Sequence, residues 1–187
     1  MRRFIVPLVI TFNNLKSVYH VSEAYDTDLY YYMQSHRPYN YVINFLLQIA
    51  NALVTLHSVG YAHLDVKPEN ILLRGRRAVL CDFATLCYLG KATSKQTQLR
   101  FGTIQYAPPE LLRGELSKKC DVYSFTKTVH VCMHGRLPDL ETMSIADYGD
   151  VYMFYHRGLQ ELPKDRMSSV ELYKLLYYFK NNMLRFF

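Results

Sequence analysis

The chain has 187 residues, half of them hydrophobic, and its 17 tyrosines and 10 phenylalanines supply large apolar side chains in the absence of tryptophan. This length and composition predict one globular domain with a sizeable core and argue against disorder. The net charge of +6 raises the question of nucleic-acid binding. The basic residues, however, form short clusters far apart in the sequence and are not interleaved with aromatic residues, so we expect no dedicated nucleic-acid site.

The four cysteines form no C-x-x-C pair and have no histidine at metal-ligand spacing. They predict neither a zinc site nor a disulfide framework, and they favour a reducing, intracellular location. One alternative stays open, because Arg2-Arg3 followed by the apolar run Phe4–Ile10 is typical of a secretory signal, although Pro7 interrupts it. No apolar stretch is expected to approach the length of a membrane span, and no membrane partner is predicted.

The first predicted element is a hairpin. Phe4–Thr11 and Lys16–Ser22 are rich in β-branched and aromatic residues, and Asn13-Asn14 between them is a turn signal. Two strands alone are marginally stable in water, so this hairpin must pack on something. A short helix is predicted over Leu29–Met33, because acidic residues precede it at its positive end.

A longer helix is predicted over Tyr39–Ser58 and ends before Gly60. Its apolar residues recur at alternating steps of four and three, and they are Val42, Leu46, Ile49, Leu53 and Leu56. Two short strands, Ile71–Leu73 and Ala78–Cys81, are expected on either side of a basic turn.

The second half of the chain is predicted to be a loop followed by helices. Thr85–Pro109 is polar, turn-rich and longer than ordinary connections, which indicates a functional or disordered loop. Asp121–His134 favours a strand by residue propensity, but it is too long and apolar for an isolated strand, so we predict a buried helix. A closing helix is predicted from Ser168 to about Asn182. We find no internal repeat and no linker to a second domain.

The polar residues with the clearest chemistry lie around the two short strands. Asp65, Lys67 and Asn70 can place a base, a cation and a metal ligand on one loop, and Asp82 can complete a Mg²⁺ site. The intervening strands would bring these two segments together, and the pattern predicts phosphoryl transfer. In the alternative interpretation, Asp65 is a turn residue, Asn70 a cap, and Asp82 a strand-end carboxylate bonded to backbone amides.

The order of these motifs resembles eukaryotic-type Ser/Thr protein kinases. The matching residues, in family order, are Leu56-His57 with Gly60, His63-x-Asp65, Asp82-Phe83, Gly102-Thr103-x-x-Tyr106, Pro109-Glu110, Asp121-Val122-Tyr123-Ser124 and Arg166. Lys67 after Val66 is similar to the Ser/Thr-directed pattern. The resemblance implies an α+β, mostly helical fold, namely a kinase-like C-lobe over residues 26–187 with a residual N-lobe β-hairpin and hinge over residues 1–25.

The same resemblance implies ATP and Mg²⁺ as cofactors and Ser/Thr hydroxyls of proteins as phosphate acceptors. In that case Asp65 would accept the hydroxyl proton and Lys67 would neutralise the transferring phosphoryl group. Asn70 and Asp82 would hold the Mg²⁺ ions. Charge stabilisation by preorganised cations, rather than covalent chemistry, would then carry the rate.

The resemblance also places the nucleotide. Ser22-Glu23-Ala24-Tyr25 resembles the hinge whose backbone hydrogen-bonds adenine, so Glu23 and Tyr25 are candidate nucleotide contacts. Asp28 would reach the ribose, and Leu72 would lie beneath the base. Glu110 and Arg166 are implied to form a buried structural pair, and Asp121 is implied to be part of the scaffold.

Two departures from the family pattern concern regulation. Leu64 replaces the Arg that grips a phosphorylated activation loop, so phosphorylation of Thr93, Ser94 or Thr97 is not expected to regulate the chain. Ala84 replaces a Gly, which should stiffen that segment and cost about 1 kcal/mol only if the position needs positive φ.

A third departure is that the sequence read here contains no glycine-rich loop and no third-strand Lys. Two hypotheses follow. In the first, the chain is a Ser/Thr kinase whose remaining parts lie upstream or come from another chain. In the second, it is an inactive kinase mimic that binds and inhibits host kinases, as truncated kinase-like proteins of some insect viruses do. The expected partner is therefore a protein substrate or another kinase.

Overall fold

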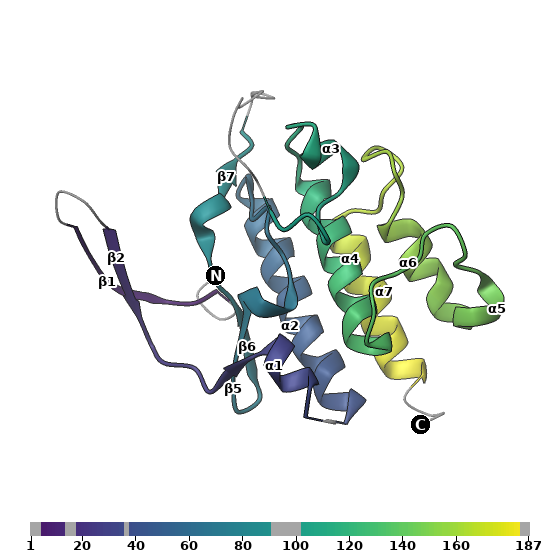
Figure 1. The fold of residues 1–187 in the computed structure, drawn as a ribbon, viewed down its shortest axis with the longest axis horizontal. Coiled ribbons are helices and arrows are strands. Elements are labelled where there is room, and N and C mark those ends of the chain that lie inside the picture. Colours follow the sequence, from purple (N-terminus) through teal and green to yellow (C-terminus); the bar gives the residue numbers. More distant parts are fainter. Residues whose placement is uncertain (1–4, 14–17, 36–37, 91–101, 184–187) are drawn as a thin grey trace.

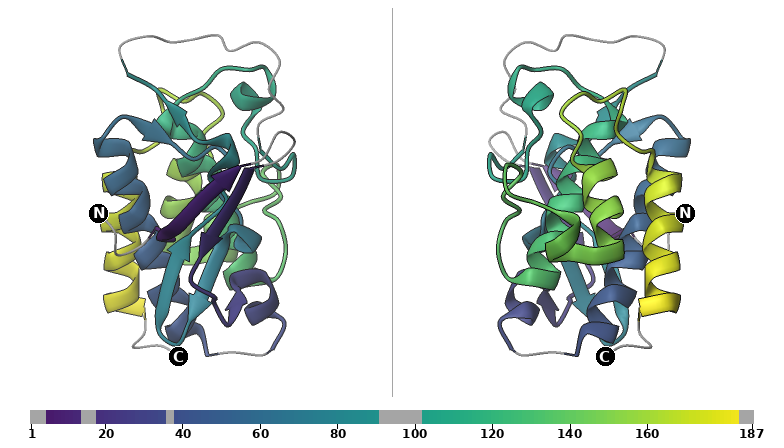
Figure 2. Two further views of the ribbon diagram at one scale, coloured as in Figure 1. Left: turned by 90° about the vertical axis from the view of Figure 1, so that its left-hand side faces the viewer. Right: turned by 90° about the vertical axis from the view of Figure 1, so that its right-hand side faces the viewer.

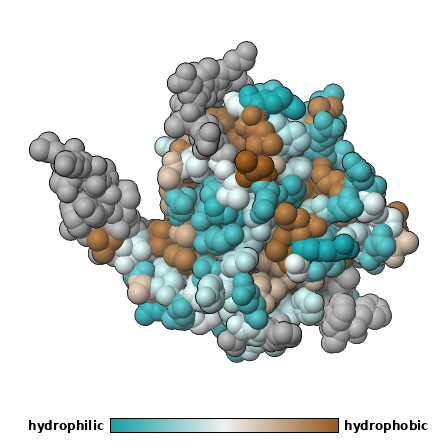
Figure 3. Space-filling view, in the orientation of Figure 1, coloured by the Kyte–Doolittle hydropathy of each residue, from teal (hydrophilic) through white to brown (hydrophobic). Residues whose placement is uncertain are grey.

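A computed structural model describes residues 5–13, 18–35, 38–90 and 102–183. It confirms the predicted mostly helical α+β fold: the helices form the main body, and the first hairpin extends from one side of it (Figure 1). On the face shown in Figure 3, hydrophobic residues form small separate patches among hydrophilic ones. The large apolar side chains of the core are buried inside the protein.

The strands of the described residues form three small antiparallel sheets. Their bounds are β1 Leu8–Asn13, β2 Val18–Ser22, β3 Thr27–Asp28, β4 Tyr61–Ala62, β5 Ile71–Arg74, β6 Arg77–Leu80 and β7 Cys87–Tyr88. β1 pairs with β2, β5 lies between β3 and β6, and β4 pairs with β7. The hairpin and the β5–β6 pair were predicted. β3, β4 and β7 were not, because two residues are too few to show an alternating pattern.

The hairpin is connected to the body by the residues before it. The Val6 amide donates to the Leu80 carbonyl at 3.0 Å, and Ile5 forms a parallel bridge with Leu80. Within the hairpin, Thr11 pairs with His20 and Phe12 with Tyr19. The charged part of the alternative secretory signal, Arg2-Arg3, lies outside the described residues.

The helices include all four that the sequence predicted. Their bounds are α1 Leu29–Met33, α2 Tyr39–Ser58, α3 Pro109–Leu112, α4 Lys118–His134, α5 Ile145–Tyr148, α6 Tyr152–Gly158 and α7 Ser169–Met183, with 3-10 turns at Pro68–Asn70, Phe83–Thr85 and Gly149–Val151. The sequence missed α3, α5 and α6, which span four to seven residues and show too little of the helical period to be recognised.

The start of α4 and the start of α7 are fixed by serine caps. Ser117 accepts a hydrogen bond from the Lys119 amide at 3.2 Å, so α4 begins before the predicted Asp121. At α7, the Ser168 amide donates to Glu171 at 2.8 Å while the Glu171 amide donates back to the Ser168 hydroxyl at 3.3 Å. This reciprocal capping box satisfies two backbone donors of the first turn.

α4 is helical despite its β-branched composition because its buried hydroxyls find partners inside the helix. Ser124, Thr126 and Thr128 each donate to the carbonyl four residues earlier, at 2.7–3.1 Å. All three are almost fully buried. Satisfied hydroxyls allow a helix with little sequence amphipathicity to lie in the core, so burial overrides residue propensity here.

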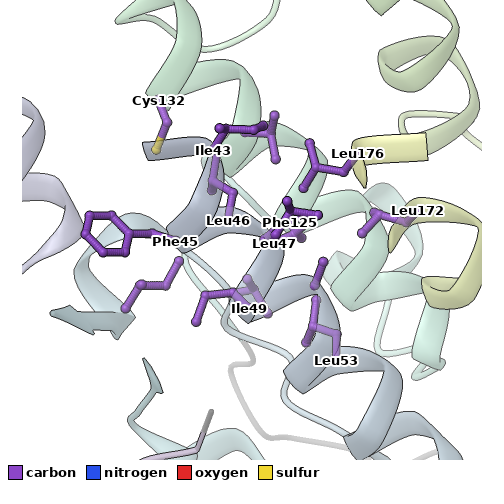
Figure 4. Packing of buried hydrophobic residues seen from close by; sticks show 14 of the residues in the cluster. Ile43, Phe45, Leu46, Leu47, Ile49, Leu53, Phe125, Cys132, Leu172 and Leu176 are labelled. Atoms are coloured by element: carbon purple, nitrogen blue, oxygen red, sulfur yellow. The ribbon is translucent and has the colours of Figure 1, made fainter. Parts of the chain in front are cut away.

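The core is built on α2, whose apolar face packs against α4, α7 and the β5–β6 sheet (Figure 4). Leu46, Ile49 and Leu53, all predicted as its buried stripe, are 0% exposed. By length and hydropathy alone α2 could cross a membrane, so the prediction that no stretch reaches that length was wrong. Its packing against other elements, with 61% of the window buried inside the protein, accounts for its apolarity.

A cluster of histidine and tyrosine rings joins the end of α4 to α5 and α6. The His130 Nδ1–H donates to the Arg136 carbonyl at 2.8 Å, and the Tyr148 hydroxyl lies 3.0 Å from His130 Nε2. His134 is similarly hydrogen-bonded to the Tyr155 hydroxyl at 3.0 Å. Burial lowers the pKa of His130 to about 4, because loss of hydration disfavours the charged ring, and this outweighs the bond to the Arg136 carbonyl, which raises it.

This cluster predicts a loss of stability in mild acid. The unfolded chain takes up a proton at His130 near its ordinary pKa of 6.5, whereas the folded chain does so only near 4. The free energy of unfolding should therefore fall as the pH drops through that window, by up to about 1.4 kcal/mol per pH unit. Urea denaturation at pH 7, 6 and 5 measures this slope.

The matched variant is His130→Gln, which cannot titrate, and its slope between pH 7 and 5 should be shallower than that of the wild-type chain. Equal slopes in the two proteins would contradict the assignment.

Candidate active site

Asp121, near the start of α4, hydrogen-bonds to the backbone of the loop that carries Asp65. The Asp121 carboxylate accepts hydrogen bonds from the backbone amides of His63 and Leu64, at 2.8 and 2.7 Å. The His57 Nε2 lies 2.8 Å from the same carboxylate. Burial alone would raise the pKa of Asp121, but the bond and charge of His57, with His63, hold it below its ordinary value.

His63 is a structural residue of this loop. Its Nε2–H donates to the Cys81 carbonyl at 2.8 Å. The His63 and Phe83 rings pack in a T-shaped arrangement, with their centres 5.1 Å apart. The His63 ring is 0% exposed and therefore has no access to a substrate. His63 therefore packs and hydrogen-bonds within the loop and is not placed to act as a base.

The Asp65 carboxylate is surrounded by donors. Its Oδ1 accepts hydrogen bonds from the Thr103 amide and hydroxyl, at 2.8 and 3.0 Å. Its Oδ2 accepts from Asn70 Nδ2 at 3.0 Å and pairs with Lys67 Nζ, also at 3.0 Å. Lys67 in turn donates to the Thr103 hydroxyl at 2.6 Å. The structure thus joins three of the predicted residues, Asp65, Lys67 and Asn70, around one half-buried carboxylate.

Thr103 was not among the predicted site residues, because the sequence shows it only as part of the motif Gly102-Thr103-x-x-Tyr106. Gly102 places it: Gly102 has φ of +75°, and an added Cβ there would lie 2.8 Å from the Leu64 carbonyl oxygen. Only glycine fits such a close backbone approach at positive φ. Thr85 was also missed, and its hydroxyl donates to the His63 carbonyl at 2.6 Å.

Asn70 and Asp82 lie on adjoining segments, since the Cys81 amide donates to the Asn70 carbonyl at 3.0 Å. Asn70 uses its amide nitrogen for both contacts with Asp65, which leaves its side-chain oxygen available as an acceptor. Asp82 is exposed, has φ of +56°, and accepts from the Ala84 amide at 3.3 Å. One amide and one carboxylate oxygen fit the hard-donor preference of Mg²⁺, which commonly takes few protein ligands beside substrate phosphates.

Ala84 carries none of the strain that its replacement of Gly might have caused. The non-glycine residues with positive φ in the described chain are Leu64 and Asp82. Ala84 sits in a 3-10 turn capped by the Asp82 side chain. The cost of about 1 kcal/mol, which was expected only if Ala84 needed a positive φ, therefore does not apply.

The predicted nucleotide contacts form a looser group. Asp28 and Leu72 are direct partners across β3 and β5, and Asp28 Oδ1 accepts from the Tyr31 amide at 2.8 Å as the cap of α1. Glu23 is exposed and lies 3.5 Å from Arg74. The Tyr25 hydroxyl is buried without a hydrogen-bond partner among the described residues. Asp28 and Leu72 are therefore brought together, whereas the Glu23 side chain is directed to the β5–β6 turn.

Leu64 lies where the family pattern has an Arg, and its side chain makes apolar contacts. It has φ of +69°, is 1% exposed, and belongs to a small cluster of buried residues. The other members of that cluster are Ala62, Cys87, Ala107, Leu111 and Cys120. This cluster attaches the loop to α3 and α4 by packing. The candidate phosphorylation sites Thr93, Ser94 and Thr97 lie outside the described residues.

Restoring the family's charged residue at this position should destabilise the chain. Leu64→Arg would bury a guanidinium among apolar neighbours, and we expect a loss of at least about 3 kcal/mol in the free energy of unfolding. Leu64→Met, which keeps volume and apolarity, should cost less than about 1.5 kcal/mol. Urea denaturation of both variants measures this, and equal stabilities would contradict the packing role.

A buried ion pair fixes the segment after this loop, as the resemblance implied. Arg166 donates to both carboxylate oxygens of Glu110, at 2.6 and 3.2 Å, and both side chains are at most 1% exposed. The guanidinium also donates to the carbonyls of Gln160, Glu161 and Lys119. α3 is thereby held against the segment that precedes α7.

This combination of fold and loop geometry is that of a protein kinase domain, and comparison with known families agrees: the protein kinase domain model matches residues 1–177. The chain therefore belongs to the protein kinase domain family.

Among curated proteins, the chain is 27% identical over 180 residues to serine/threonine-protein kinase mrck-1 of Caenorhabditis elegans, covering 90% of this chain and 11% of that protein. It is 30% identical over 145 residues to citron rho-interacting kinase of Rattus norvegicus, covering 73% and 7%. It is also 27% identical over 135 residues to Genghis Khan of Drosophila melanogaster, covering 68% and 8%. The chain thus spans only a small part of the length of these relatives, all of which are named kinases and two of which are named serine/threonine-protein kinases.

Proposed function

We propose that the chain transfers the γ-phosphate of ATP to Ser or Thr hydroxyls of a protein. The observation that supports this most is the network around Asp65. A base that orients an attacking hydroxyl must be fixed before the substrate arrives, and Thr103 and Asn70 fix both oxygens of this carboxylate. Lys67, 3.0 Å from Asp65, is placed to balance charge on the phosphoryl group.

The donor side of the reaction would use Asn70 and Asp82. These two residues would hold Mg²⁺, which would supply positive charge to offset the negative charge on the transferring phosphoryl group. Asn70 presents its side-chain oxygen because its amide nitrogen is already committed to Asp65. Asp28 and Leu72, paired across β3 and β5, would contact the ribose and the base, and the Glu23–Tyr25 backbone would contact adenine.

The test uses the purified chain with Mg²⁺, labelled ATP and a generic basic protein as acceptor. Asp82→Asn removes the carboxylate that would hold Mg²⁺, and we expect it to abolish the signal. Asp150→Asn alters an exposed carboxylate of a distant 3-10 turn and should leave the signal unchanged. Equal labelling by the wild-type chain and Asp82→Asn would rule out the proposal.

A second candidate function, inhibitory binding to another kinase, is favoured by the first hairpin. β1 and β2 form a sheet of their own, with no third strand among the described residues. Figure 1 shows the hairpin standing clear of the helices. Free strand edges are templates for pairing with another chain.

Co-purification of the full chain with a panel of purified kinases tests this second candidate. Val21→Pro removes a backbone donor from β2 and should weaken retention. A panel in which no kinase is retained above background would count against this function.

A further inference from the structure

A groove with both polar and apolar lining residues lies between α2, α7 and the turn that joins β5 to β6. Its volume is about 590 Å³. Both views of Figure 2 show α7 alongside α2, and the two helices pack together. The residues that present side chains to the groove include Asn40, Asn44 and Asn51 of α2, Arg76 of the turn, and Tyr177 and Lys180 of α7.

The walls of this groove are fixed by contacts within the protein. Gln48 of α2 donates through Nε2 to the Arg76 carbonyl and accepts through Oε1 from the Ala78 amide, both at 3.0 Å. The Arg76 guanidinium lies 5.8 Å from the centre of the Tyr41 ring. These contacts attach the turn to α2, so the groove exists before any ligand binds.

The groove is positively charged. Arg76 and Lys180 line it, and no Asp or Glu is among the lining residues. Neither cation forms an ion pair with another residue of the described chain. In contrast, the neighbouring Arg74 pairs with Glu23. Two cations without an ion-pair partner, in a groove also lined by carboxamide and tyrosine side chains, favour an anionic ligand that also offers hydrogen-bonding groups.

We propose that this groove docks an acidic segment of a protein partner. Its carboxylates would pair with Arg76 and Lys180, and the carboxamides of Asn40 and Asn51, which offer both donors and acceptors, would bond its backbone. A nucleic acid fits less well, because phosphate recognition relies on a longer stripe of cations than the two present.

The groove is separate from the phosphoryl-transfer site. β5 leads from Ile71, which follows Asn70, to Arg74 at the turn. Four residues of strand span roughly 13 Å. A partner held in the groove could thus present another of its segments to Asp65, but binding itself does not depend on catalysis.

Fluorescence anisotropy of three labelled probes tests the proposal with the full chain. The probes are a dodecapeptide of Glu with Leu at every third position, the same peptide with Lys in place of Glu, and a single-stranded DNA 12-mer. We expect the acidic peptide to bind most tightly. The double variant Arg76→Glu/Lys180→Glu should weaken its binding at least tenfold, because it reverses both groove charges.

Lys174→Glu is the matched control, since Lys174 is exposed on the same helix, α7, but does not line the groove. It should change the affinity less than twofold, and thermal unfolding of every variant checks that it is folded. Asp65→Asn should bind the acidic peptide as the wild-type chain does, which separates this proposal from phosphoryl transfer. The proposal would be overturned if the acidic peptide did not bind, or if the basic peptide or the DNA bound more tightly. It would also be overturned if Lys174→Glu weakened binding of the acidic peptide as much as the double variant does.

Discussion

Asp65→Asn is expected to lower the rate of phosphoryl transfer by roughly 10²–10⁴-fold, the range typical for loss of a general base. The amide that replaces the carboxylate keeps one oxygen that can accept from Thr103, and Asn70 still donates to the backbone carbonyl of residue 65 at 2.8 Å, so the loop should keep its shape. It cannot take the hydroxyl proton, and it leaves Lys67 without the negative charge 3.0 Å away. Initial rates of label transfer from ATP to a basic acceptor protein measure the effect.

Nucleotide binding separates this effect from a loss of folding. The thermal shift produced by Mg²⁺ and ATP should persist in Asp65→Asn and diminish in Asp82→Asn, because only the second variant removes a proposed metal ligand. Undiminished transfer by Asp65→Asn would exclude Asp65 as the base. Transfer that disappears together with the folded state would instead show that the network is structural.

Breaking the ion pair between Glu110 and Arg166 should have the largest effect on stability. In Arg166→Met the Glu110 carboxylate stays buried without its partner, and the carbonyls of Gln160, Glu161 and Lys119 lose their donor. Removal of one member of a buried pair typically costs about 3–5 kcal/mol. We expect a loss in that range, measured by urea denaturation at pH 7.

The double variant Glu110→Leu/Arg166→Met should recover part of this loss, because it leaves no isolated buried charge. The cycle of single and double variants gives the coupling energy of the pair. The surface pair Arg113–Glu115 is the control, since both members are more than half exposed. Its disruption should cost less than about 1 kcal/mol. A similar small cost for Arg166→Met would contradict the assigned role.

Much of the fold was predictable because its longer elements have clear periodic patterns. α2 has its predicted bounds, Tyr39–Ser58, since an apolar residue recurs every three or four positions and burial follows that period. α5 and α6 were not predicted. Their few residues are positioned by contacts such as the ring cluster of His130 and Tyr148, which lie 18 positions apart in the sequence.

The motif order and residue types determined the class of the protein and nominated Asp65, Lys67, Asn70 and Asp82. The tertiary structure decided how these residues are used. Thr103, 38 positions beyond Asp65, completes the carboxylate's hydrogen bonds, and Leu64 belongs to an apolar cluster in place of a charged contact. A motif records which chemical groups are present along the chain, whereas hydrogen bonding and burial depend on segments that only folding brings within a few ångströms.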